Sequence, residues 1–205
     1  MPGTRTDLVW EPMPLASVVR LLEGAPFTWW IAGGWALDLH RGRQSRAHGD
    51  TDIGVSRHDQ AAVQRYFASE WRLYVAHDGK LTPWLPGEWL PSPKDDIWIS
   101  RNAESPWTLQ TMLVNIVKGQ WLYKRLPSIR RAFDDTLLHT PDGIPYLRPE
   151  IQLLYKGGKP VWEDKAWRDL HTMLPVLTAE ERAWLRSSLA AQFPEGHAWI
   201  DALDS

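Results

Sequence analysis

The spacing of apolar residues predicts a helix, a strand and a second helix near the start of the chain. Residues 14–23 carry apolar side chains three or four positions apart and stop at Gly24, as an amphipathic helix does. Residues 28–32 form a short aromatic run of the kind found in buried strands. A glycine pair follows, and residues 35–41 predict a short helix that ends at Gly42.

The next regular pattern is a strict alternation over residues 50–55, which predicts a β-strand. Side chains in a strand point alternately to its two faces, so Asp50, Asp52 and Gly54 should share one face. The branched residues between them should anchor the strand in the core. We therefore expect two carboxylates to project side by side over a bare glycine.

Later patterns predict the remaining elements. One further helix is expected to begin at Ser56 and Asp59, which form a variant of the capping box. Others are expected over residues 149–156 and 165–174, and after the capping box formed by Thr178 and Glu181. Further strands are expected over residues 71–76, 97–100, 107–117 and part of 121–133. Prolines recur between residues 81 and 94, where we expect an irregular loop or an edge segment.

The helix expected at residues 165–174 has an apolar stripe that decides which side chains it buries. We place Trp167, Leu170, His171 and Leu174 on this stripe. His171 is therefore expected in the core or in a seam between elements.

Composition excludes several classes of protein. The chain has 205 residues, 43% of them hydrophobic and 23% charged, which is ordinary for a globular protein of one large or two small domains. A net charge of −2 gives no basic field for nucleic acid, which argues against a polymerase or a tRNA-modifying enzyme. The lack of cysteine excludes disulfides and thiolate metal sites and leaves the redox compartment open. Residues 1–14 have no apolar stretch of signal-peptide length and no apolar run is long enough to span a membrane, so we expect a cytoplasmic protein.

The two aspartates and the glycine pair have complementary chemistry. Neighbouring carboxylates repel unless a cation lies between them, and Mg²⁺ binds one or two carboxylates together with phosphate oxygens and water. Gly33 and Gly34 have no side chains, so a triphosphate can approach their backbone and the N-terminus of the helix that follows. Each feature alone is common, since Asp-x-Asp often occurs on solvated edges and Gly-Gly in plain turns.

The order of these motifs resembles a known superfamily. An apolar strand, Gly-Gly, a short helix and Gly-Asp-x-Asp on a strand, with Asp50 sixteen positions after Gly34, are similar to the nucleotidyltransferases related to DNA polymerase beta. Within that superfamily the sequence looks like the aminoglycoside and lincosamide nucleotidyltransferases. The resemblance implies an α+β fold, with a mixed β-sheet flanked by helices and a small C-terminal helical region. It also implies ATP as the nucleotide donor and one or two Mg²⁺ ions held by Asp50 and Asp52.

Two later segments are also similar to this subgroup. Residues 146–156 imply that Lys156 binds phosphate, although a cation at this end of a helix also stabilises the helix by itself. Residues 164–175 imply that Asp169 faces the acceptor, although surface solvation would equally explain this carboxylate.

Two further residues are candidates for nucleotide binding. The chain has fourteen tryptophans, most of which we assign to the core; Trp35, directly after the glycines, is the best placed to stack on a base or a sugar. His48 lies two residues before Asp50, in a polar loop, and its role is open.

The strand expected at residues 107–117 departs from the superfamily pattern. The relatives have a third carboxylate there, and the matching position in this chain is Gln110. An amide can bind a metal or orient a hydroxyl but cannot take a proton at neutral pH. Asp96, on the neighbouring strand, can substitute as base or acceptor contact, or is simply a turn carboxylate.

We therefore expect a magnesium-dependent transferase that moves AMP from ATP to a hydroxyl of a small acceptor, such as an aminoglycoside or a lincosamide. Residues 1–140 would form the catalytic core and residues 141–205 a helical region packing on the cleft. The protein would act as a monomer or homodimer without nucleic acid or membrane. One alternative is an inactive member serving as a nucleotide-binding or antitoxin-like module, which Gln110 favours. Another is a sugar-binding surface of tryptophans with calcium at Asp50 and Asp52.

Overall fold

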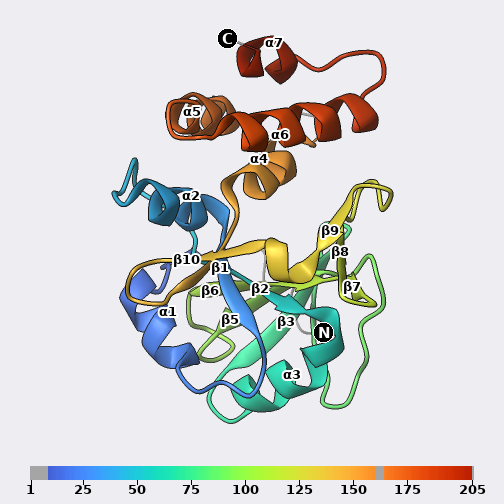
Figure 1. Cartoon of the computed structure of the whole chain (residues 1–205). Helices are drawn as coiled ribbons and strands as arrows, with labels where there is room; N and C mark the ends of the chain where they lie inside the picture. The colour runs from blue at the N-terminus through green and yellow to red at the C-terminus, as the bar shows by residue number, and fades with distance from the viewer. Residues whose placement is uncertain (1–8, 160–163, 205) are drawn as a thin grey trace. The chain divides into compact units, whose positions relative to one another are not determined.

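The computed structural model describes residues 9–159 and 164–204, and contacts between residues divide the chain into two compact units (Figure 1). The first unit comprises the chain up to Ile31 and Ala47–Ile116, and the second comprises Ala32–Arg46 and the chain from Val117 onward. This division differs from the expected boundary at residue 140 in two ways: the second unit already begins at Val117, and it includes the segment with the glycine pair.

The first unit is a mixed sheet with two helices. Its elements are α1 (Leu15–Leu22), β1 (Trp29–Ala32), β2 (Asp52–Ser56), the 3-10 helix η2 (Arg57–Asp59), α3 (Gln60–Ala68), β3 (Arg72–His77), β4 (Lys80–Pro83), β5 (Asp96–Ser100) and β6 (Leu109–Val114). The strands lie in the order β1, β2, β6, β5, β3, β4. β2 and β6 are parallel, whereas β5 is antiparallel to both β6 and β3, and β4 is antiparallel to β3.

The alternation predicted for residues 50–55 is present. Thr51, Ile53 and Val55 are buried, whereas Asp50 and Asp52 are half-buried. The hydrogen-bonded strand itself begins at Asp52, so Asp50 lies in the segment that leads into it. The branched side chains therefore fix the face on which the two carboxylates project.

The glycine on that face is not bare, which corrects one expectation. Trp30 on β1 lies directly over Gly54, with only 1% of its surface exposed. A β-carbon added at Gly54 would be 2.3 Å from Cε2 and Nε1 of this indole. Gly54 is thus required by the close approach of a large aromatic ring from the neighbouring strand.

The second unit contains most of the helices. Its elements are α2 (Gly33–Arg41), β7 (Ile116–Val117, at the boundary), β8 (Gln120–Leu122), β9 (Arg130–Ala132), the 3-10 helix η3 (Phe133–Asp135), β10 (Leu137–His139), β11 (Pro145–Leu147), α4 (Pro149–Gly157), α5 (Asp164–Met173), α6 (Ala179–Gln192) and α7 (Trp199–Leu203). β10 pairs with β11 as a hairpin, and β7, β8 and β9 form a small sheet. Helix α4 contacts α2, α5 and α6 and is buried over most of its length, so it forms the centre of this unit.

Helix ends follow the predicted signals closely. Gly42 ends α2 in the left-handed conformation, with φ of 71°. The capping box of α6 is present, because Thr178 and Glu181 each accept a hydrogen bond from the other's backbone N–H. The short helix α7 has no such signal and was not predicted. Within the part of the chain that the structure describes, no helix is long and apolar enough to cross a bilayer.

The stripe predicted for α5 is wrong by one position. The buried residues of this helix are Ala166, Asp169, Leu170 and Met173. His171 is exposed and stacks on Trp167, with ring centroids 5.6 Å apart, so it is not a core histidine. The buried stripe contains an aspartate, and a search for apolar residues therefore favoured the neighbouring register.

Replacing Gly54 with alanine should destabilise the protein by about 1–3 kcal/mol, because the new methyl group overlaps the Trp30 indole. Urea unfolding would measure this loss. Gly49→Ala is the matched control, since nothing lies within 4 Å of a β-carbon there. Equal stabilities of the two variants would contradict the close packing of Trp30 on Gly54.

Candidate functional site

Parallel pairing of β2 with β6 places Asp52 directly opposite Gln110. Both side chains are half-buried on the same face of the sheet in the first unit. Asp50 precedes Asp52 by two residues and is also half-buried. The structure thus places the predicted metal ligands close to Gln110, the amide that occupies the position of the superfamily's third carboxylate.

Asp96 joins this group through a side-chain contact. Gln110 Nε2 donates a hydrogen bond to Asp96 Oδ1 at 3.3 Å. Asp96 is the first residue of β5, paired with Ala76 and Met112, so the interpretation as a turn carboxylate is wrong. A carboxylate therefore lies in contact with the amide that replaces the third acid.

The oxygen atoms on this face fit a hard divalent cation. Within residues 9–159 and 164–204, no group of three or more His, Asp and Glu side chains is arranged to hold a metal ion. Mg²⁺ binds one or two carboxylates and takes its other ligands from water and phosphate, so two aspartates are a sufficient protein contribution.

In the second unit, the glycine pair forms the first turn of α2 rather than a loop before it. Gly33 has a φ of 66°, in the left-handed region that favours glycine. Its N–H donates to Gln152 Oε1 on α4 at 2.8 Å. Gln152 was missed from the sequence, where its only signal is a polar residue within the apolar run of this helix.

Asp169 lies in an ion cluster that also contains Lys156. Its Oδ1 accepts from Arg46 Nε at 3.0 Å, and its Oδ2 lies 3.2 Å from Arg46 Nη2 and 2.8 Å from Lys156 Nζ. The side chain is 5% exposed, so the surface interpretation of Asp169 is wrong. Burial by itself would raise the pKa of Asp169, but Arg46 and Lys156 outweigh it and hold this pKa below its ordinary value.

The loop that carries Arg46 is fixed by a second buried carboxylate. Asp38, near the end of α2, accepts hydrogen bonds from the backbone and hydroxyl of Ser45 at 3.0 and 2.5 Å. A cavity of about 340 Å³ lies beside this loop; it is lined by Ser45, Arg46, Arg168, Asp169, His171 and Thr172. Asp169, one of the lining residues, is already paired with Arg46 and Lys156.

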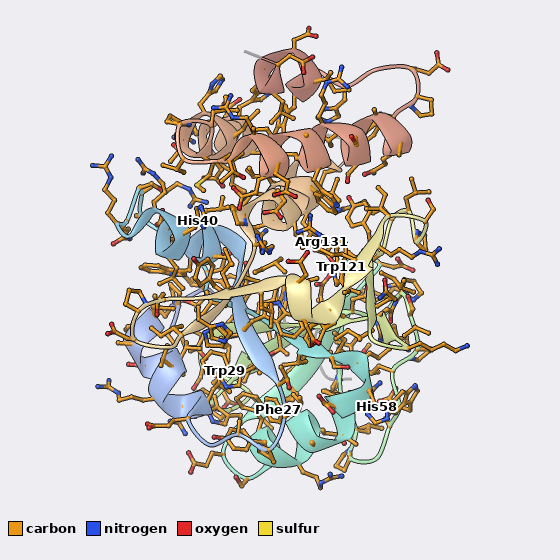
Figure 2. The ribbon with its side chains drawn as sticks, in the orientation of Figure 1. Phe27, Trp29, His40, His58, Trp121 and Arg131 are labelled. Atoms are coloured by element: carbon orange, nitrogen blue, oxygen red, sulfur yellow. The ribbon has the colours of Figure 1, made fainter. Side chains whose placement is uncertain are left out.

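A further buried ion pair stabilises the same unit away from this cavity. Arg131 on β9 lies across from Trp121 on β8 (Figure 2), and its Nη1 contacts Glu150 Oε1 at 2.5 Å. Its guanidinium also lies over the Trp184 ring, 4.4 Å from the centroid. Burial raises the pKa of Glu150, and Arg131 opposes part of this rise. Arg131 thus has a packing role in the second unit.

The remaining candidates are one residue in each unit. Trp35 is half-buried in the first turn of α2, directly after the glycine pair, in the second unit. His48 is half-buried in the segment that precedes β2, in the first unit.

Comparison with known proteins confirms the resemblance seen in the sequence. The profile of the aminoglycoside-2''-adenylyltransferase family matches residues 14–77, which include the glycine pair and both aspartates of the Asp-x-Asp motif. The lincosamide resistance protein of Staphylococcus haemolyticus is 37% identical over 49 residues. That alignment covers 23% of this chain and 30% of the relative, so the chain matches less than a third of that protein's length.

Solved structures show the fold. The lincosamide antibiotic adenylyltransferase LnuA, bound to lincomycin, superposes with a TM-score of 0.54 at 21% identity, over 80% of this chain and 96% of its own. ANT(2'')-Ia in complex with adenylyl-2''-tobramycin gives 0.57 at 12% identity, over 86% and 95%. The expected α+β nucleotidyltransferase fold is therefore confirmed.

Replacing Asp169 with asparagine should lower the free energy of unfolding at pH 7 by about 3 kcal/mol, because Arg46 and Lys156 lose their buried counter-charge. The folded pKa of Asp169 is depressed, so its contribution is fully present above the ordinary value of 3.8 and is lost as the pH falls through the folded pKa. The stability difference between wild type and variant should therefore shrink on acidification below about pH 4.

Chemical denaturation at a series of pH values would follow this difference. Asp201→Asn, at an exposed position on α7, is the matched control and should change stability by less than about 0.5 kcal/mol. A difference that stayed constant down to pH 3 would show that the charge of Asp169 is not what stabilises the cluster.

Proposed function

We propose that this protein transfers AMP from ATP to a hydroxyl of a small acceptor of the aminoglycoside or lincosamide class, in a reaction that depends on Mg²⁺. The observation that carries the proposal is the group formed by Asp52, Gln110 and Asp96 on adjacent strands. The likeness of residues 14–77 to aminoglycoside adenylyltransferases and the fold shared with LnuA support it.

Asp50 and Asp52 would hold the metal, since their carboxylates lie on the polar face of β2 and of the segment before it. Bound Mg²⁺ would neutralise charge on the phosphates of the nucleotide. The buried Thr51 and Ile53 keep the two carboxylates on one face, which preserves their orientation during the reaction.

The proposed nucleotide contacts lie in the second unit, except His48, which lies in the first. Gly33 and Gly34 present the N-terminus of α2, whose N–H groups and dipole favour phosphate oxygens. Trp35 and His48 are proposed as contacts to the rest of the nucleotide. Lys156 keeps donors beyond the one directed at Asp169, because an ammonium group has three N–H bonds.

The acceptor hydroxyl would lose its proton to Asp96. Gln110 cannot take a proton, but its N–H bond to Asp96 holds that carboxylate beside the position of the missing third acid. Asp169 already binds Arg46 and Lys156 with its two oxygens. We therefore assign it an indirect role, that of holding these cations at the edge of the cavity beside Ser45, where the acceptor would bind.

The non-catalytic alternative loses its main support in this arrangement. It rested on Gln110, because this amide replaces the expected third carboxylate and cannot accept a proton. Because Gln110 hydrogen-bonds to Asp96, a carboxylate is available on the same face of the sheet.

Asp50→Asn and Asp52→Asn should each abolish pyrophosphate release from ATP and magnesium, because the metal loses a charged ligand. The assay would use a panel of aminoglycosides and lincosamides. Asp142→Asn, in an exposed turn, is the matched control and should keep wild-type turnover. Full activity of the double variant Asp50→Asn, Asp52→Asn would exclude the mechanism. If no acceptor gave turnover while calorimetry showed ATP binding, the protein would be a binding module or would use another acceptor.

Asp96→Asn should lower kcat by about 10²–10⁴-fold, the usual contribution of a general base, with little change in KM for ATP. Gln110→Ala should cost less, since Asp96 would lose an orienting contact but keep its charge. Steady-state kinetics with the best acceptor of the panel would measure both. A larger effect of Gln110→Ala than of Asp96→Asn would contradict this assignment of roles.

A further inference from the structure

The side-chain amide of Gln152 has a fixed orientation in the interior of the second unit. Gln152 lies on α4 and is 5% exposed. The backbone N–H of Gly33 can donate only to an acceptor, so the atom 2.8 Å from it must be the carbonyl Oε1 and not the amide nitrogen. The contact between residues 119 positions apart thus defines where Nε2 lies.

That nitrogen is available to a ligand. Nε2 is bonded to the same carbon as Oε1, so it also lies at the first turn of α2. It makes no hydrogen bond to any residue in the described ranges 9–159 and 164–204. A nearly buried side chain therefore presents an amide donor with no protein acceptor in the described ranges.

The surroundings of this donor favour an anion. The N-terminus of α2 carries partial positive charge, and its first turn contains no acidic residue. Gly33 and Gly34 are buried, and having no side chains they add no bulk beside this turn. Lys156 lies one helical turn after Gln152 on α4, so the two side chains share one face of that helix.

A purely structural role for Gln152 would use only the carbonyl oxygen of its side-chain amide. That oxygen accepts the N–H of Gly33, which has a left-handed conformation with a φ of 66°. The two N–H bonds of Nε2 contribute nothing to that contact. They lie beside the N-terminus of a helix, where the backbone favours phosphate oxygens.

We propose that Gln152 binds the nucleotide directly, donating from Nε2 to a phosphate oxygen while Oε1 accepts the N–H of Gly33. This inference rests on the proposed function, because the phosphate belongs to ATP. It assigns a nucleotide-binding role to a residue of α4 that also positions the glycine pair.

Gln152→Glu separates the two roles. The carboxylate keeps an acceptor for the Gly33 N–H, but it removes the donor and places negative charge beside the phosphates. We expect the dissociation constant for ATP with magnesium to rise about 10- to 100-fold, as for a lost hydrogen bond to a charged group. The loss should be larger at pH 8.5 than at pH 6, because burial raises the pKa of the introduced carboxyl and a larger fraction of it is charged at the higher pH.

Isothermal titration would measure the affinity and thermal melting the fold. Gln120→Glu introduces the same change at a half-buried site on β8 and should leave ATP affinity unchanged. Gln152→Met, which removes both the donor and the acceptor, should weaken ATP binding and also lower the melting temperature. In the wild-type protein, the side-chain amide signals of Gln152 should shift on addition of ATP in an NMR titration, a readout that does not depend on any variant.

The outcomes distinguish the two hypotheses. If the wild type does not bind ATP, the proposed function fails and this inference fails with it. If the wild type binds ATP but folded Gln152→Glu binds equally well at both pH values, Gln152 is only structural and the inference is wrong. Should Gln152→Glu not fold, unchanged Gln152 amide signals in ATP-saturated wild type would overturn the inference, and shifted signals would support it.

Discussion

Parallel pairing of β2 with β6 is the interaction on which the candidate site depends. It sets Asp52 beside Gln110, and Gln110 in turn reaches Asp96 on β5. A slip of one residue in this register would turn Asp52 into the core and bring Ile53 to the polar face. The buried branched residues of β2 prevent that slip, so the apolar side of the strand is what keeps the chemical side in place.

Local features of the fold were predictable because their causes are local. The strand over residues 50–55 follows from alternation, the end of α2 from Gly42, and the start of α6 from Thr178 and Glu181, each within a few residues of the element it defines. The glycine pair and the two aspartates were likewise identified from short-range pattern. Their roles in binding and catalysis remain predictions.

Features that depend on distant residues were not predictable in this way. The bond from Gly33 to Gln152 joins positions 119 residues apart, and Trp30 reaches Gly54 from another strand. Burial of Asp169 was missed because the apolar pattern of α5 fits two registers, and only Arg46 and Lys156 make the register with a buried aspartate stable. Such pairings follow from topology, which the order of residues along one helix does not reveal.

The segment Ala32–Arg46 groups with the C-terminal half of the chain although it lies within the N-terminal part of the sequence. The second unit is therefore built from two stretches of chain, and no single cut in the polypeptide can release it whole. A fragment that ends before α4 would retain Gly33 without the Gln152 carbonyl that accepts its N–H. The hydrogen bond that Gly33 donates to Gln152 can therefore form only after α4 has been synthesised, so the glycine pair cannot acquire all its native contacts from the N-terminal part of the chain alone.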